Sequence, residues 1–167
     1  MEKIKYIYIL SQRYSGSTLL SYLLGTHPDI ATIGERRKFY VNSWKTDEHP
    51  DQRLCSCGTP FYQCSHWNEI KSSVYERLKG TKLSSNATEF KIFNHKLFNQ
   101  IASEMVKYSL IRGLKWSKLP FKKRLEELLH FNQVLVEEIL RIQQKPIFLD
   151  SSKTIDHILY LLSLIHI

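Results

Sequence analysis

The sequence lacks a long hydrophobic run. No segment of its 167 residues reaches the roughly 18 to 20 consecutive apolar residues that span a bilayer, and the apolar run from Tyr6 to Leu10 is too short for a signal peptide. Cysteine is also scarce: the three residues Cys55, Cys57 and Cys64 are odd in number and close together, which does not suit a disulfide framework. We therefore expect no membrane span and a location in the cytoplasm.

Internal repeats, low-complexity tracts and long tails of one charge sign are absent as well. The length and the 43% hydrophobic content suit one domain, residues 1–167, or a piece of one. The formal net charge of +8 favours a polyanionic partner such as a nucleotide or a sulfated sugar. No recognised nucleic-acid-binding module accompanies this charge, so nucleic acid is not expected as a partner.

The N-terminal segment predicts a strand, a loop and a helix in direct succession. Lys5 to Leu10 is rich in β-branched and aromatic residues, which favours a short buried strand. The polar stretch Ser11 to Thr18 follows as a loop, and leucines then recur at helical spacing until Gly25 and Pro28 end the helix. These leucines are Leu19, Leu20, Leu23 and Leu24.

The rest of the chain alternates helices with short strands. The expected elements are strands at 30–33 and 147–149 and helices at 68–78, 89–112, 119–144 and 154–164. Thr88 is the expected N-cap of the helix at 89–112. The strand at 147–149 ends in a polar turn, Asp150-Ser151-Ser152-Lys153.

This alternation predicts an α/β fold. We expect a P-loop-like three-layer fold with a central parallel sheet flanked by helices, incomplete at the C-terminus, and a loop-rich and helical insertion at about 36–144. Ligands of open α/β sheets bind beyond the carboxyl ends of the strands. The polar turns at 11–18 and 150–153 both occupy this position.

The first of these turns has the composition of an anion-binding loop. A helix that begins in a Gly- and Ser-rich loop directs unpaired N–H groups and the positive end of its dipole at the loop. Gly16 lets the backbone approach a phosphate closely, the hydroxyls of Ser17 and Thr18 add donors, and Arg13 adds a forked cation. The simpler interpretation is a serine-rich turn that only caps the helix.

A nucleotide kinase or triphosphatase is a second interpretation of this loop. Its phosphate-binding motif is G-x-x-x-x-G-K-[ST], in which the Lys reaches the terminal phosphates. No Lys follows Gly16, and Asp150 is the one carboxylate that suggests itself for Mg²⁺. The kinase interpretation therefore lacks its central residue.

The stretch Tyr8-Ile9-Leu10-Ser11-Gln12-Arg13-Tyr14-Ser15-Gly16-Ser17-Thr18-Leu19-Leu20, followed by His27-Pro28 and Gly34-Glu35, resembles the N-terminal segment of sulfotransferases that use 3′-phosphoadenosine-5′-phosphosulfate (PAPS). The turn at 148–153 is similar to the one before the helix that leads to the 3′-phosphate site, and the stretch with Cys55, Cys57 and Cys64 is similar to an insertion in bacterial members. In the family, a basic residue usually lies two positions before the glycine. Here Tyr14 has that position, and Arg13 lies one further back.

The resemblance implies an enzyme that transfers a sulfuryl group from PAPS to a hydroxyl or amine of an acceptor, which is a carbohydrate, a lipid, a small molecule or a protein. It implies that the 5′-phosphosulfate is held by Arg13, Tyr14, Ser15, Gly16, Ser17, Thr18 and Leu19. Glu35 is the candidate general base, by similarity to the tyrosine-modifying relatives. Its alternative is a surface carboxylate that pairs with a neighbouring arginine.

Three further expectations concern the catalytic cations, the extent of the chain and metal binding. Arg13 and Lys153 are the candidate catalytic cations, although a lysine in a turn is more often simply solvated. The family's 3′-phosphate segment, an Arg-Asp-Pro-Arg-like motif, would follow Ile167, so we expect the chain to be the N-terminal part of such an enzyme, and a non-catalytic truncated fragment is an open alternative. Thiolates and an imidazole are suitable zinc ligands, so a zinc site of Cys55, Cys57, Cys64 and His66 is an open alternative. No metal is expected, because their spacing fits no common zinc ribbon or finger.

Overall fold

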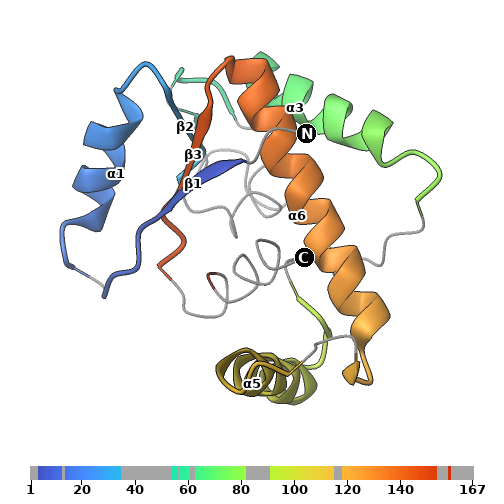
Figure 1. Cartoon of the computed structure of the whole chain (residues 1–167). Coiled ribbons are helices and arrows are strands. Elements are labelled where there is room, and N and C mark those ends of the chain that lie inside the picture. The colour runs from blue at the N-terminus through green and yellow to red at the C-terminus, as the bar shows by residue number, and fades with distance from the viewer. Residues whose placement is uncertain are drawn as a thin grey trace. The chain divides into compact units, whose positions relative to one another are not determined.

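The computed structural model describes residues 4–12, 14–34, 54–55, 57–60, 63–81, 91–114, 118–153 and 158. This part of the chain is mixed α/β, with a three-stranded parallel sheet and four helices (Figure 1). The chain divides into two compact units, one formed by residues 1–81 and 134–152 and the other by residues 82–133 and 153–167. Most of the helix expected at 154–164 lies outside the described residues.

The sheet belongs to the first unit and joins segments that are far apart in the sequence. Its strands are β1 (Lys5–Tyr8), β2 (Ile30–Thr32) and β3 (Ile147–Asp150), in the order β1-β3-β2. Both pairings are parallel, and the register places Tyr8 opposite Asp150 and Thr32 opposite Leu149. The three predicted strands and their parallel arrangement are therefore confirmed.

A small hydrophobic core supports this sheet. Ile9, Ile30 and Leu149 are buried together, and Ile7, Leu24 and Ile147 pack against them partly buried. These aliphatic residues lie on or next to all three strands and on the helix that follows β1. Burial of a single such side chain contributes about 1.5–3 kcal/mol, so the core fixes the strands that carry the candidate site.

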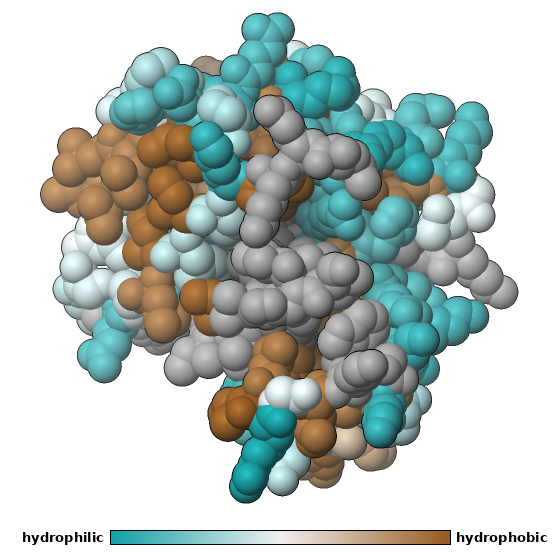
Figure 2. Space-filling model, viewed as in Figure 1, coloured by the Kyte–Doolittle hydropathy of each residue, from teal (hydrophilic) through white to brown (hydrophobic). Residues whose placement is uncertain are grey.

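Helix α1 (Ser17–Gly25) buries small residues, and three of its four leucines are exposed, whereas Leu24 packs against the core. Ser17 and Ser21 are buried, and a Cβ atom added to Gly25 would lie 2.9 Å from Cγ2 of Thr32 on β2. The exposed leucines of α1 form part of the hydrophobic surface at the left of Figure 2. They are Leu19, Leu20 and Leu23. The leucine spacing thus predicted the helix correctly but does not mark its buried face.

Two further helices contribute to the first unit. They are α3 (Ser65–Arg77) and the second half of α6 (Lys122–Gln143). Ile70 and Val74 on α3 are buried, as are Leu135 and Ile139 on α6. In the view of Figure 1 the sheet lies between α1 and the end of α6. Both helices were predicted, and α3 begins slightly before the expected residue 68.

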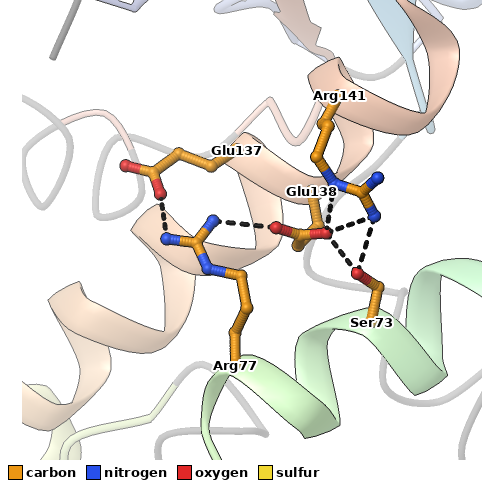
Figure 3. A network of polar contacts seen from close by, with 5 residues as sticks. All are labelled: Ser73, Arg77, Glu137, Glu138 and Arg141. Atoms are coloured by element: carbon orange, nitrogen blue, oxygen red, sulfur yellow. Dashed lines mark hydrogen bonds and ion pairs between the residues drawn. The ribbon is translucent and has the colours of Figure 1, made fainter.

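A polar network joins α3 to α6 (Figure 3). The carboxylate of Glu138 is buried and accepts hydrogen bonds from Ser73, from Nη1 of Arg77 at 2.8 Å and from Nε of Arg141 at 2.9 Å. The second guanidinium nitrogen of Arg77 reaches Glu137 at 2.6 Å. Burial opposes the charge of Glu138, but the three donors outweigh it and hold its pKa below the ordinary value.

The second unit contains helix α5 (Lys96–Ile111) and the first half of α6. The predicted start of α5 near Glu89 is wrong, because residues 91–95 are not helical. Oδ1 of Asn99 accepts the N–H groups of Ile92 at 2.9 Å and of Phe93 at 3.2 Å, which holds this segment in a turn before the helix. The expected N-cap, Thr88, lies outside the described residues.

The predicted apolar stripe of α5 is largely exposed. Leu97, Ile101, Met105 and Tyr108 are exposed, whereas Ala102, Ser103, Val106 and Ser109 are buried. Hydrophobic surface lies over α5 at the bottom of Figure 2, and an apolar groove of about 640 Å³ runs along it. No helix in the described part of the chain is both long and apolar enough to cross a membrane.

Candidate functional site

The carboxyl ends of β1 and β3 lie side by side, because the two strands are parallel neighbours with Tyr8 opposite Asp150. The chain leaves β1 into the loop that leads to α1, and it leaves β3 into the turn at 150–153. The backbone N–H of Ile9 donates to the carbonyl of Asp150 at 2.9 Å, which extends the pairing to the first residue of the loop. The two polar turns singled out in the sequence therefore begin at the same edge of the sheet.

The loop between β1 and α1 leads into the helix at Gly16. Gly16 is the N-cap of α1 and adopts a left-handed conformation with φ 74°, which glycine adopts without steric cost. The first hydrogen bond of the helix runs from the N–H of Leu20 to the carbonyl of Gly16 at 3.0 Å, so the N–H groups of the first turn point toward the loop. A Cβ atom at Gly16 would meet nothing within 4 Å, so there is open space beside it.

The side chains of this loop differ in exposure. Tyr14, with φ 62°, is fully exposed, and Ser15, Thr18 and Leu19 are exposed as well. Ser17 is buried at the start of the helix. Sequence patterns gave no sign of the position of Ser11, whose hydroxyl is buried without a hydrogen-bond partner among the described residues. A serine hydroxyl has one donor and two acceptor positions, and a buried one is usually hydrogen-bonded.

Asp150 organises the opposite side of this edge. Its carboxylate is fully buried: Oδ2 accepts the hydroxyl of Tyr6 at 3.0 Å, and Oδ1 accepts the N–H of Ser152 at 2.9 Å and its hydroxyl at 2.6 Å. The N–H of Ser151 donates to the carbonyl of Gly34 at 3.2 Å. Asp150 therefore fixes the turn after β3, and both of its oxygens are occupied by protein donors.

No family model, curated protein or solved structure matches the chain.

The structure describes only part of the predicted catalytic set. Arg13 and Glu35 lie outside the described residues. Gly34, which directly precedes Glu35, is described, and its hydrogen bond to Ser151 places it at the carboxyl edge of the sheet. Lys153 is partly buried and has a left-handed backbone with φ 62°.

The three cysteines form a second group of reactive side chains in the first unit. The sulfur atoms of Cys55, Cys57 and Cys64 all lie within 4.8 Å of one another. The hydroxyl of Thr59, 3.0 Å from Sγ of Cys57, and its backbone lower the pKa of this exposed thiol to about 6. Burial raises the pKa of the Cys64 thiol. These three cysteines were candidates for a zinc site on their residue types, although their spacing matched no common metal motif; their convergence is a finding of the structure.

Proposed function

We propose that the chain binds the 5′-phosphosulfate of PAPS in the loop between β1 and α1 and acts in sulfuryl transfer to an acceptor hydroxyl or amine. The observation that carries this proposal is the left-handed Gly16 at the N-terminus of α1, beside open space and at the carboxyl end of a parallel strand. The corresponding fold is a P-loop-like three-layer arrangement. The parallel order β1-β3-β2 and the packing of α1 beside β2 are consistent with it.

The described residues suit a sulfate or phosphate group better than they suit a metal-bound triphosphate. The first-turn N–H groups and the helix dipole favour an anion, and each such charge near a helix N-terminus is stabilised by about 0.3–1 kcal/mol. A triphosphatase needs a lysine after the glycine and a carboxylate for Mg²⁺. Ser17 stands after Gly16, and both oxygens of Asp150 already accept protein hydrogen bonds.

The proposed reaction is an in-line displacement at sulfur. The acceptor oxygen or nitrogen forms a bond to sulfur, the bond from sulfur to the bridging phosphate oxygen breaks, and adenosine 3′,5′-bisphosphate leaves with that electron pair. The first-turn N–H groups, Ser17 and Arg13 stabilise the negative charge on the sulfonate and on the departing phosphate. Lys153 neutralises the bridging oxygen, and Glu35 takes the proton of the acceptor.

Calorimetric titration with adenosine 3′,5′-bisphosphate tests nucleotide binding, with Gly16→Asp as the blocking variant. A carboxylate placed about 5 Å from the phosphate costs about 3 kcal/mol at an effective dielectric constant of about 20, which weakens binding on the order of 100-fold. Gly80→Asp is the matched control, because Gly80 also has a left-handed backbone, with φ 84°, and open space beside it, but lies in the turn after α3. This control should bind like the unmodified chain.

The outcomes separate a nucleotide site from a simple helix cap. Binding that is lost in Gly16→Asp and retained in Gly80→Asp supports the proposal, and a transfer assay with labelled PAPS and a panel of sugar, lipid and phenol acceptors then follows. A folded chain that binds no nucleotide refutes it. Equal loss in both glycine variants would show that the effect comes from the backbone and not from the loop.

A further inference from the structure

The three cysteine sulfurs are closer together than a loop of free thiols requires. Sγ of Cys64 lies 3.5 Å from Sγ of Cys55 and 3.7 Å from Sγ of Cys57. All three sulfurs fall within 4.8 Å of one another. They converge on a common point from two different segments of the chain, the turn at 55–58 and the start of α3.

A short hairpin holds the first two cysteines. The N–H of Cys55 donates to the carbonyl of Thr59 at 2.8 Å, and the N–H of Gly58 donates back to the carbonyl of Cys55 at 2.8 Å. Gly58 has φ 85°, which permits the tight turn, and Leu54 pairs with Pro60 in an antiparallel bridge. The backbone of this turn therefore holds both cysteines, and Sγ of Cys64 lies within hydrogen-bonding distance of each of their sulfurs.

The third cysteine is held by a helix. Cys64 is the N-cap of α3: its N–H donates to the carbonyl of Pro60 at 3.1 Å, and its own carbonyl accepts the N–H of Asn68 at 3.0 Å. Its side chain is buried. The positive end of the helix dipole at this position favours a negatively charged sulfur.

These separations match the edges of a metal tetrahedron. Zinc binds thiolates at about 2.3 Å, so two sulfurs on a tetrahedral zinc ion are about 3.8 Å apart. A disulfide would need about 2.05 Å, and none of the three cysteines is in a disulfide in the structure. We propose that Cys55, Cys57 and Cys64 together bind one zinc ion through their thiolates, a soft ligand set suited to zinc.

The fourth position of this zinc ion is not supplied by the described residues. No further His, Cys, Asp or Glu of the described part of the chain joins the cluster. His66 follows on α3, but its Nε2 lies 3.3 Å from Nε2 of Gln143 on α6. Each thiol gives up its proton when the metal binds, so binding is weakened at low pH.

The role assigned to this zinc ion is structural. It joins the hairpin at 54–60 to the first residue of α3, and α3 is in turn tied to α6 through Ser73, Arg77 and Glu138. Loss of the metal would release the hairpin and leave the buried Cys64 as a thiol. The site does not depend on the proposed sulfuryl transfer, and either proposal can fail without the other.

The test measures metal content in the full chain, expressed with zinc and purified under reducing conditions. Elemental analysis should find about one zinc ion per chain, and each of Cys55→Ser, Cys57→Ser and Cys64→Ser should lower it at least about tenfold. His66→Gln is the control and should keep its zinc. Substitution with cobalt should give the visible bands of a tetrahedral ion and a thiolate-to-metal absorption.

A measurement on the unmodified chain covers the case in which the cysteine variants fail to fold. Titration with an organomercurial that blocks thiols should release the zinc in step with modification of the cysteines, as followed with a colorimetric chelator. A reduced, folded chain that retains less than about a tenth of an equivalent after dialysis against zinc would refute the site. Loss of zinc from His66→Gln would refute the three-cysteine ligand set.

Discussion

Substitution of Glu138 tests how much the buried polar network between α3 and α6 contributes to the stability of the first unit. Its carboxylate is 3% exposed and accepts hydrogen bonds from one hydroxyl and two guanidinium groups. Glu138→Gln removes the negative charge. It also replaces one carboxylate oxygen, which accepts hydrogen bonds, with an NH₂ group that faces the donors of Ser73, Arg77 and Arg141. Breaking a buried ion pair from one side costs about 3–5 kcal/mol. The partners Arg77 and Arg141 are 43% and 61% exposed and regain water, so we expect a loss of about 2–3 kcal/mol in the free energy of unfolding.

The neighbouring residue gives a matched control. Glu137→Gln makes the same chemical change one position earlier, but Glu137 is 19% exposed, and its carboxylate pairs with Arg77 at 2.6 Å. Such partly exposed pairs contribute about 0.5–1 kcal/mol. Urea unfolding at pH 7, with the slope of the transition unchanged, should therefore place Glu138→Gln about 2 kcal/mol below Glu137→Gln. Equal losses in the two variants would refute the importance assigned to burial and to the second guanidinium.

The same pair of variants has a defined pH dependence. The pKa of Glu138 is lower in the folded chain than its ordinary value, so its contribution to stability is present above the unfolded pKa of about 4.3 and is lost as the pH falls through the folded pKa. The stability difference between the unmodified chain and Glu138→Gln should therefore shrink as the pH is lowered from 7 to below 4. A difference that stays constant over this range would contradict the network in Figure 3.

Three further experiments have defined expected outcomes. Gly25→Ala should lower the free energy of unfolding by about 1–2 kcal/mol, because the new methyl group lies 2.9 Å from Cγ2 of Thr32 and overpacking outweighs the better helix propensity of alanine; a more stable variant in a thermal melt would show that the contact yields freely. In metal-free, reduced protein, alkylation of Cys57 should reach half its maximal rate near pH 6, the pKa of that thiol, whereas a midpoint above pH 8 would contradict the role of its hydrogen bonds. Asp150→Ala should cost about 2–3 kcal/mol in urea unfolding and Tyr6→Phe about 1 kcal/mol, because the first change leaves buried donors unpaired and the second removes one hydroxyl; similar losses in both would refute the central position of Asp150.

The order of elements could be predicted from local sequence signals. The strand at 147–150 was recognisable because β-branched and aromatic residues follow a helix-breaking Lys145-Pro146, and α1 because its leucines recur at helical spacing before Gly25. The position of Gly16 at the start of α1 followed from the same pattern. These features depend on residues next to one another in the chain, so a single sequence contains them.

Contacts between distant residues were beyond this kind of prediction. Helix α5 begins at Lys96 and not near Glu89, because Asn99 captures the N–H groups of Ile92 and Phe93. The periodic apolar residues of α5 remain largely exposed, since periodicity reports a helix and not which face another segment covers. The convergence of the three cysteines likewise depends on a turn and a helix start that spacing alone does not reveal.

The central position of β3 in the sheet has a consequence for folding during synthesis of the protein. Within the described residues, β1 and β2 pair with β3 and with no other strand, and Tyr6 and Asp150, which share a hydrogen bond, are 144 positions apart. Closing so large a loop is slow and must precede any gain from the contacts it brings. During synthesis on the ribosome, β1 and β2 leave the exit tunnel long before β3 does. The hydrogen-bonding edges of β1 and β2 stay unpaired until then. The loop at Gly16 should therefore acquire its final setting only after residue 150 has left the exit tunnel, which makes folding of this unit a late event in synthesis.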